Sequence, residues 1–179
     1  MKSYFVFDCE SVGLHGETFA CGGGVYLESG EMQSEFSFAC LPDNANGTQV
    51  DRKWISECVP ALDTTHATPR EIRDAFWKQW LKADKQGAKM AADCGWPVKA
   101  KFLLQCVADD PEKRNRQGPY PMIEIATLRM AAGMDPVGEC IRKTNELPEH
   151  DPLADVRQSA RLLFEALAKI NEPRQPAGE

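Results

Sequence analysis

Hydrophobic and polar positions in the first part of the chain follow the period of a β-strand. A compact aromatic and β-branched run occupies residues 3–9, a second apolar segment covers 19–27, and polar and apolar side chains alternate over 32–41. Alternation with a period of two is typical of half-buried strands. These segments predict a three-strand antiparallel meander. Glycines 22–24 interrupt the second strand and indicate a bulge or the close approach of another backbone.

Helical periodicity dominates the later part of the chain. Thr68, Pro69 and Glu71 form a helix start with a capping box, and the apolar spacing that follows predicts a helix over 69–85. Asp151 and Pro152 open a final helix that we expect to reach about residue 170. The segments between predict a helix at 52–58, a strand at 89–93, a helix at 98–108, a loop at 110–121, a strand at 122–125 and a helix ending near 132.

This order of elements predicts an α/β fold. A run of strands followed by strands that alternate with helices indicates a mixed sheet, partly antiparallel and partly parallel, flanked by helices. A chain of 179 residues is most simply one domain. We place a single domain at residues 1–170 and expect residues 171–179, which include two prolines, to form a flexible tail.

Composition narrows the possible partners and compartments. A net charge of −6 gives no general attraction for nucleic acid, so any grip on phosphates must be local or come through bound metal cations. Seven cysteines without a C-x-x-C pair indicate reduced thiols in a cytoplasmic protein, and we expect Cys9, Cys94 and Cys106 to be buried. No segment approaches the roughly 20 apolar residues of a membrane span, so we expect no membrane partner. The oligomeric state stays open.

The first apolar run ends in a pair of carboxylates. Asp8 and Glu10 are two residues apart, so on a strand both side chains point to the same face. Two neighbouring carboxylates with little solvation favour a divalent cation, and oxygen ligands suit Mg²⁺ or Mn²⁺. The alternative is that Asp8 marks the end of the strand and Glu10 is a solvated loop residue.

Two further places in the chain combine suitable side chains. Asp93 follows the strand predicted at 89–93, and functional residues gather beyond the carboxyl ends of such strands. His150 and Asp155 flank the start of the final helix, and a histidine side chain is suited to deprotonate a water near neutral pH. The alternatives are a turn-forming aspartate at Asp93 and, at Asp155, an acid that only complements the helix dipole.

Taken in order, these motifs resemble those of the DEDDh branch of the DnaQ-like 3′–5′ exonucleases, whose fold is RNase H-like. The first motif is similar to Phe7-Asp8-Cys9-Glu10 followed by Gly13-Leu14, and the third is similar to the segment from His150 to Asp155. Asp93 stands where the second motif is expected, although Met90-Ala91-Ala92 replaces the histidine and asparagine that often precede it. Asp109 and Asp110 are rival candidates, but they follow a predicted helix rather than a strand.

The resemblance implies a site and a reaction. Asp8, Glu10, Asp93 and Asp155 would hold two divalent ions, Mg²⁺ or Mn²⁺, and His150 would be the general base. The expected substrate is DNA or RNA with a single-stranded 3′ end, and the expected product is a nucleoside 5′-monophosphate. The residues expected against the 3′-terminal nucleotide are Ser11, Val12, Gly13 and Leu14.

Two alternative functions remain open. One is a 3′–5′ exoribonuclease that acts on short or structured RNA ends, and the other is a catalytically silent module that binds nucleic acid or protein. The basic loop from Lys113 to Arg116 either guides phosphates or is a solvated surface. Trp96 is close enough in sequence to Asp93 to stack on a base, but we expect it, like Trp77 and Trp80, to lie in the core. His15 has no assigned role.

Overall fold

A computed structural model describes residues 2–136 and 141–172 as a five-stranded mixed sheet with the strand order β3-β2-β1-β4-β5. The predicted meander is formed by β1 (Ser3–Ser11), β2 (Thr18–Leu27) and β3 (Met32–Ala39), which pair antiparallel. Two short strands, β4 (Lys89–Ala92) and β5 (Ile123–Glu124), continue the sheet in parallel from β1. The predicted fold class, a mixed sheet of the RNase H-like type flanked by helices, is confirmed.

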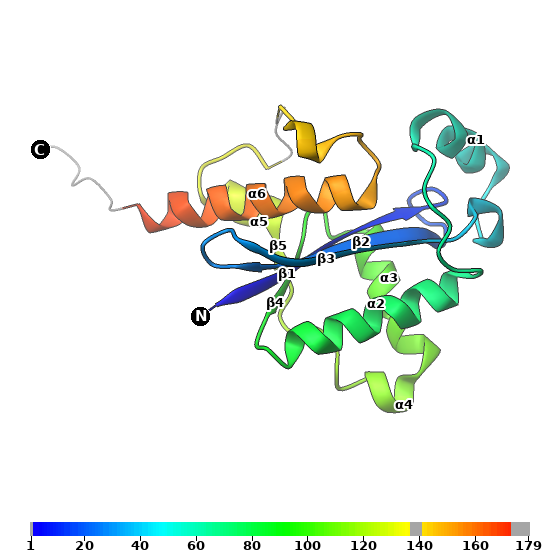
Figure 1. Cartoon of the computed structure of the whole chain (residues 1–179), viewed down its shortest axis with the longest axis horizontal. Coiled ribbons are helices and arrows are strands. Elements are labelled where there is room, and N and C mark those ends of the chain that lie inside the picture. The colour runs from blue at the N-terminus through cyan, green and yellow to red at the C-terminus, as the bar shows by residue number, and fades with distance from the viewer. Residues whose placement is uncertain (1, 137–140, 173–179) are drawn as a thin grey trace, which may run out of the picture.

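Helices cover both faces of the sheet (Figure 1). One face is covered by α2 (Pro69–Asp84) and α3 (Val98–Asp109), and the other by α5 (Ile125–Ala131) and α6 (Pro152–Asn171). The central strand β1 therefore packs on both sides. Its odd-numbered side chains, such as Phe5 and Phe7, join the core under α2 and α3, whereas Tyr4 and Val6 join the core under α6.

The remaining elements lie at the ends of the sheet or in connections. They are α1 (Gln49–Cys58), the short α4 (Pro111–Arg114) and two 3₁₀ turns, η1 (Pro42–Asn44) and η2 (Thr144–Glu146). The α4 turn lies where the sequence predicted only a loop. Arg114 is held there by an ion pair with Asp74 and lies 5.6 Å from the ring centre of Trp77, so this part of the basic loop is structural.

Both predicted helix starts are confirmed by their hydrogen bonds. The capping box of α2 forms between Thr68 and Glu71, and the Asp151 carboxylate accepts hydrogen bonds from the backbone of Leu153 and Ala154 at 2.9 Å. These bonds satisfy amide groups that have no partner within the helix. They also fix the residue at which α6 begins, and thus the position of Asp155 one turn later.

Gly22 lets the start of α6 lie directly on β2. A Cβ atom at Gly22 would stand 2.7 Å from the carbonyl carbon and oxygen of Pro152, closer than any side chain allows. The close approach that the three glycines predicted is therefore real at this position. Gly23 serves a different contact, since the ring of Phe36 occupies the space where its Cβ would be.

Some expectations from the sequence are wrong. Trp96, expected in the core, has 77% of its surface exposed and lies in the turn between β4 and α3. Cys94 is exposed as well, whereas Cys9 and Cys106 are buried as predicted. Most of the predicted tail lies outside the described residues, so the division into a domain and a tail stays a prediction. Cys140 also lies outside the described residues. None of the helices in the part of the chain that the structure describes has the length and apolar character of a membrane span.

Candidate active site

A cavity of about 450 Å³ lies at the carboxyl end of β1 and brings the five predicted catalytic residues together. Its wall is formed by β1, by the turn after β4, by the first turn of α3 and by the start of α6. The carboxyl edge of parallel strands is where binding sites of open α/β sheets lie. The residues in question are Asp8, Glu10, Asp93, His150 and Asp155.

The segment after β1 contributes three of the four residues that the resemblance places against substrate. Ser11, Gly13 and Leu14 line the cavity, and Leu14 has 66% of its surface exposed. Val12 does not line it, because its side chain is fully buried in the core and packs against Gly47. The exposed apolar surface of Leu14 is suited to contact with a base.

Asp8 and Glu10 lie on the face of β1 that α6 covers. They continue the row of Tyr4 and Val6, and each residue has less than a tenth of its surface exposed, at 6% and 8%. The strand extends to Ser11, so the alternative of a solvated loop residue at Glu10 is wrong. The fold thus places two carboxylates side by side with little water around them.

A lysine from α3 neutralises Asp8. The Lys99 Nζ atom lies 2.7 Å from Asp8 Oδ1, and the two side chains are only 13% and 8% exposed. Burial by itself lowers the pKa of Lys99, but the charge and hydrogen bond of Asp8 outweigh burial and raise it above its usual value. Lys99 therefore carries a fixed positive charge inside the cavity.

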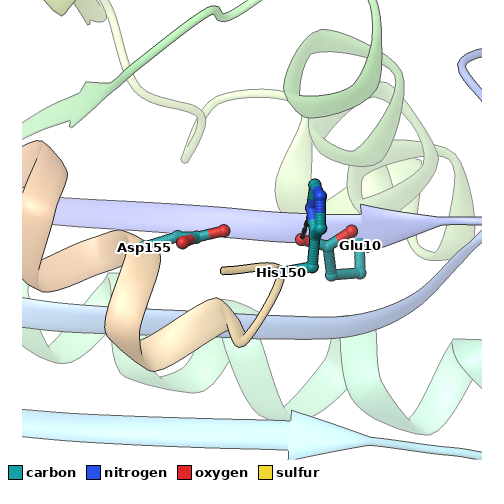
Figure 2. A group of neighbouring side chains, drawn as sticks. All are labelled: Glu10, His150 and Asp155. Carbon is teal, nitrogen blue, oxygen red and sulfur yellow. Dashed lines mark ion pairs between the residues drawn. The ribbon is translucent and has the colours of Figure 1, made fainter. Parts of the chain in front are cut away.

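Glu10 and Asp155 form the second part of the site (Figure 2). Burial, followed by the charges of Asp8 and Asp155, raises the pKa of Glu10 from 4.5 to about 9. Burial and the charge of Asp8 raise the pKa of Asp155 to about 6, although the guanidinium of Arg142 pairs with Asp155 Oδ1 and opposes the shift. Both carboxylates would gain from a further cation between them.

His150 lies beside Glu10, just before the N-terminus of α6. Its Nδ1 lies 3.7 Å from Glu10 Oε1, and its ring packs edge-on against Trp54 of α1 with ring centres 5.0 Å apart. The backbone of His150 has a left-handed φ of +62°, which turns the chain into the Asp151 cap of the helix. The ring is thus held between an acid and an aromatic side chain.

Asp93 faces the same cavity with an unsatisfied oxygen. Its Oδ1 is buried and has no hydrogen-bond partner, and burial raises the pKa of the carboxyl while the nearby charge of Lys99 opposes that rise. Its rivals lie elsewhere, because Asp109 pairs with Arg73 at 2.6 Å and Asp110 pairs with Lys113 at 3.2 Å. Neither rival lines the cavity, so of the three candidates for the second motif only Asp93 lies beside the residues of the first and third motifs.

The described side chains fit a divalent metal. Glu10, His150 and Asp155 each offer one ligand atom, and these atoms all lie within 4.8 Å of one another. Carboxylate oxygens with an imidazole nitrogen suit Mn²⁺, Zn²⁺ or Mg²⁺ rather than a soft ion. The buried Oδ1 of Asp93 lacks a hydrogen-bond partner and is a further oxygen that a cation could satisfy.

Several residues that line this cavity were not predicted, among them Lys99, Arg142, Trp54 and Asp51. The sequence does contain a signal for Lys99, because this lysine lies in the first turn of a helix, where a positive charge is unfavourable next to the helix dipole. Such local conflicts often occur at functional sites. Asp51 accepts a hydrogen bond from the Thr48 hydroxyl and lies against Gly13. Nothing in the sequence pattern placed α1 next to the site.

Solved structures of exonuclease I share this fold. Exonuclease I from Methylocaldum szegediense aligns with a TM-score of 0.66 at 16% sequence identity. A zinc-bound complex of E. coli exonuclease I with single-stranded DNA aligns with a TM-score of 0.61 at 13% identity, and another exonuclease I structure, studied for the origin of processivity, aligns at 0.61 and 15%. Each alignment covers 97% of this chain.

These similarities establish the fold and show how much of the exonuclease I chains it corresponds to. The chain spans 42% of the length of the exonuclease I proteins that it matches, so it corresponds to one part of them. No protein-family model matches the sequence, and no curated protein does. The fold is that of the exonuclease I nucleases, an RNase H-like mixed sheet with helices on both faces.

Proposed function

We propose that this chain is a divalent metal-dependent 3′–5′ exonuclease of the DEDDh type. The observation that carries the proposal is the meeting of Glu10, His150 and Asp155 in a cavity that also contains Asp8 and Asp93. Exonuclease I, whose fold this chain shares, has been solved with single-stranded DNA. The proposed substrate is DNA or RNA with an unpaired 3′ end, and the proposed product is a nucleoside 5′-monophosphate.

The carboxylates would hold the metal. The resemblance implies two divalent ions, Mg²⁺ or Mn²⁺, bound by Asp8, Glu10, Asp93 and Asp155. When bound, such ions stabilise the charge that develops on the phosphate and favour ionisation of a water. The high pKa of Glu10 means that its proton leaves when a cation binds, so metal affinity increases with pH.

His150 would act as the general base. It accepts a proton from the water that attacks phosphorus, while the bond from phosphorus to the 3′ oxygen of the preceding nucleotide breaks and that oxygen takes up a proton. Glu10 and Trp54 hold the imidazole in place from two sides. Ser11, Gly13 and Leu14 would position the terminal nucleotide.

A gel assay with matched DNA and RNA oligonucleotides tests this function. Strands labelled at the 5′ end should shorten progressively from the 3′ end in Mg²⁺ or Mn²⁺ and stay intact in chelator. Asp155→Asn should be inactive, whereas Asp63→Ala, an exposed acid that does not line the cavity, should keep full activity. A preference for RNA over the matched DNA would favour the exoribonuclease alternative.

The catalytically silent module is the competing proposal. The pairing of Lys99 with Asp8 and of Arg142 with Asp155 favours it, since both cations belong to the chain and occupy two of the acids. A silent module would give no product with any divalent ion, although it could still bind the labelled strands. The same gel, combined with a binding assay, separates the two proposals.

A further inference from the structure

Lys99 lies among the carboxylates that line the cavity. Its ammonium contacts Asp8 at 2.7 Å, and the charge of Asp93 also acts on it. Both acids line the same cavity as Glu10 and Asp155. The four acids are thus divided, with Asp8 and Asp93 around Lys99 and with Glu10, Asp155 and His150 around the remaining space.

The formal charges of the site match one divalent ion. Asp8, Glu10, Asp93 and Asp155 carry four negative charges when ionised, and Lys99 and Arg142 contribute two positive charges in direct ion pairs. The remaining two negative charges are neutralised by a single divalent cation. A second divalent ion would have to displace Lys99 from Asp8 or lie next to its ammonium, and like charges at such distances repel strongly where water is scarce.

We propose that Lys99 replaces one of the two metal ions, so that the chain binds a single divalent ion between Glu10 and Asp155, beside His150. This inference rests on the proposed nuclease function and changes the expected number of ions. An ammonium has three N–H donors, and the bond to Asp8 uses one. The other two are available to an oxygen of the scissile phosphate, so Lys99 contacts the reacting group as a fixed cation.

Mn²⁺ titration of the purified protein tests this assignment without reference to activity. Isothermal titration calorimetry, or electron paramagnetic resonance of free Mn²⁺, should give one bound ion per wild-type chain. Lys99→Met removes the charge but keeps most of the volume, and it should bind two ions because Asp8 loses its partner and can hold an ion together with the unpartnered Oδ1 of Asp93. Lys101→Met, which changes a lysine of the same helix that does not line the cavity, should bind one ion.

Activity provides a second readout. Lys99→Met should lower kcat by roughly 10²–10³-fold, the usual effect of removing one electrostatic stabiliser of the transition state, with a smaller change in KM. Lys99→Arg keeps the positive charge, so it should bind one ion, and its circular dichroism should match the wild type. If Lys99→Met does not fold, Lys99→Arg tests the assignment in its place. Two ions bound to Lys99→Arg would contradict the assignment.

The outcomes separate this inference from the proposed function. Two Mn²⁺ ions bound to the wild type, together with metal-dependent cleavage, would overturn the role of Lys99 and leave the nuclease intact. One ion bound to both the wild type and Lys99→Met would also overturn it. No ion bound and no cleavage would reject the metal-dependent nuclease itself.

Discussion

Gly22 of β2 and Pro152 of α6 are in backbone contact, and this contact sets the distance between the two halves of the candidate site. A Cβ at Gly22 would lie 2.7 Å from the Pro152 carbonyl. Because Asp8 pairs with Gly22 across the sheet, the same contact holds the start of α6 opposite the first carboxylate.

Gly22→Ala should therefore disturb both stability and activity. We expect a loss of about 1–3 kcal/mol in the free energy of unfolding, the usual cost of overpacking, because backbone cannot move aside as a side chain can. Turnover should fall as well, since Asp155 lies in the first turn of α6 and His150 comes just before the helix. Urea denaturation and the oligonucleotide assay measure the two effects. Gly118→Ala is the control, because its added Cβ meets nothing within 4 Å, and an equal effect in both variants would argue against the contact.

His150→Asn should remove the general base and leave the fold intact. Asparagine tolerates the left-handed φ of +62° at this position better than alanine does, so the turn into α6 is preserved. We expect turnover to fall roughly 10²–10⁴-fold, the usual contribution of a general base, with little change in the melting temperature. Near-normal turnover by this folded variant would remove His150 from the role.

Asp8→Ala should destabilise the metal-free protein through Lys99. The substitution leaves an ammonium that is only 13% exposed without its partner, and removal of one member of a buried pair costs about 3–5 kcal/mol. Adding Lys99→Met to Asp8→Ala should recover part of this loss. A double-mutant cycle by urea denaturation measures the coupling, and additive effects of the two substitutions would show that the pair is not formed.

Glu10 should make the metal-free protein less stable as pH rises. Its pKa is raised from 4.5 to about 9, so the folded chain binds this proton more tightly than the unfolded chain does. Its contribution to stability is complete below pH 4.5 and is lost as pH rises to about 9. Asp155 acts in the same direction between pH 3.8 and about 6.

Urea midpoints of the chelated protein across this pH range test the prediction. Glu10→Gln should flatten the pH dependence, because the amide does not titrate, and saturating Mn²⁺ should flatten it in the wild type. Indistinguishable pH profiles for the wild type and Glu10→Gln in chelator would show that Glu10 does not carry the effect.

The elements of the fold were predictable where the sequence contains local information. The capping box at Thr68 and the cap at Asp151 were recognised because they depend on residues a few positions apart. The compact aromatic and β-branched run before Asp8 identified β1 for the same reason. The turn of α4 was missed, because it has four residues and is held by Arg114 through contacts with α2 that no local pattern reveals.

The site was predicted only in part, because the cations that pair with its acids come from segments distant in the sequence. Asp8, Glu10 and Asp155 could be recognised from motif spacing, but the motif did not show that Lys99 and Arg142 pair with two of them. The exposure of Trp96 was missed for a related reason, since periodicity does not tell whether a turn residue faces the core. Long-range partners have to be found in three dimensions.

The split of the site between β1 and α6 links hydrolysis to the completion of folding. On the ribosome, Asp8 and Glu10 are synthesised before His150 and Asp155, so the nascent polypeptide lacks the second half of the site until α6 has been made. Even then the acids meet only when α6 docks on the sheet. A chain with the proposed nuclease activity would therefore stay inert towards nearby RNA throughout its own translation.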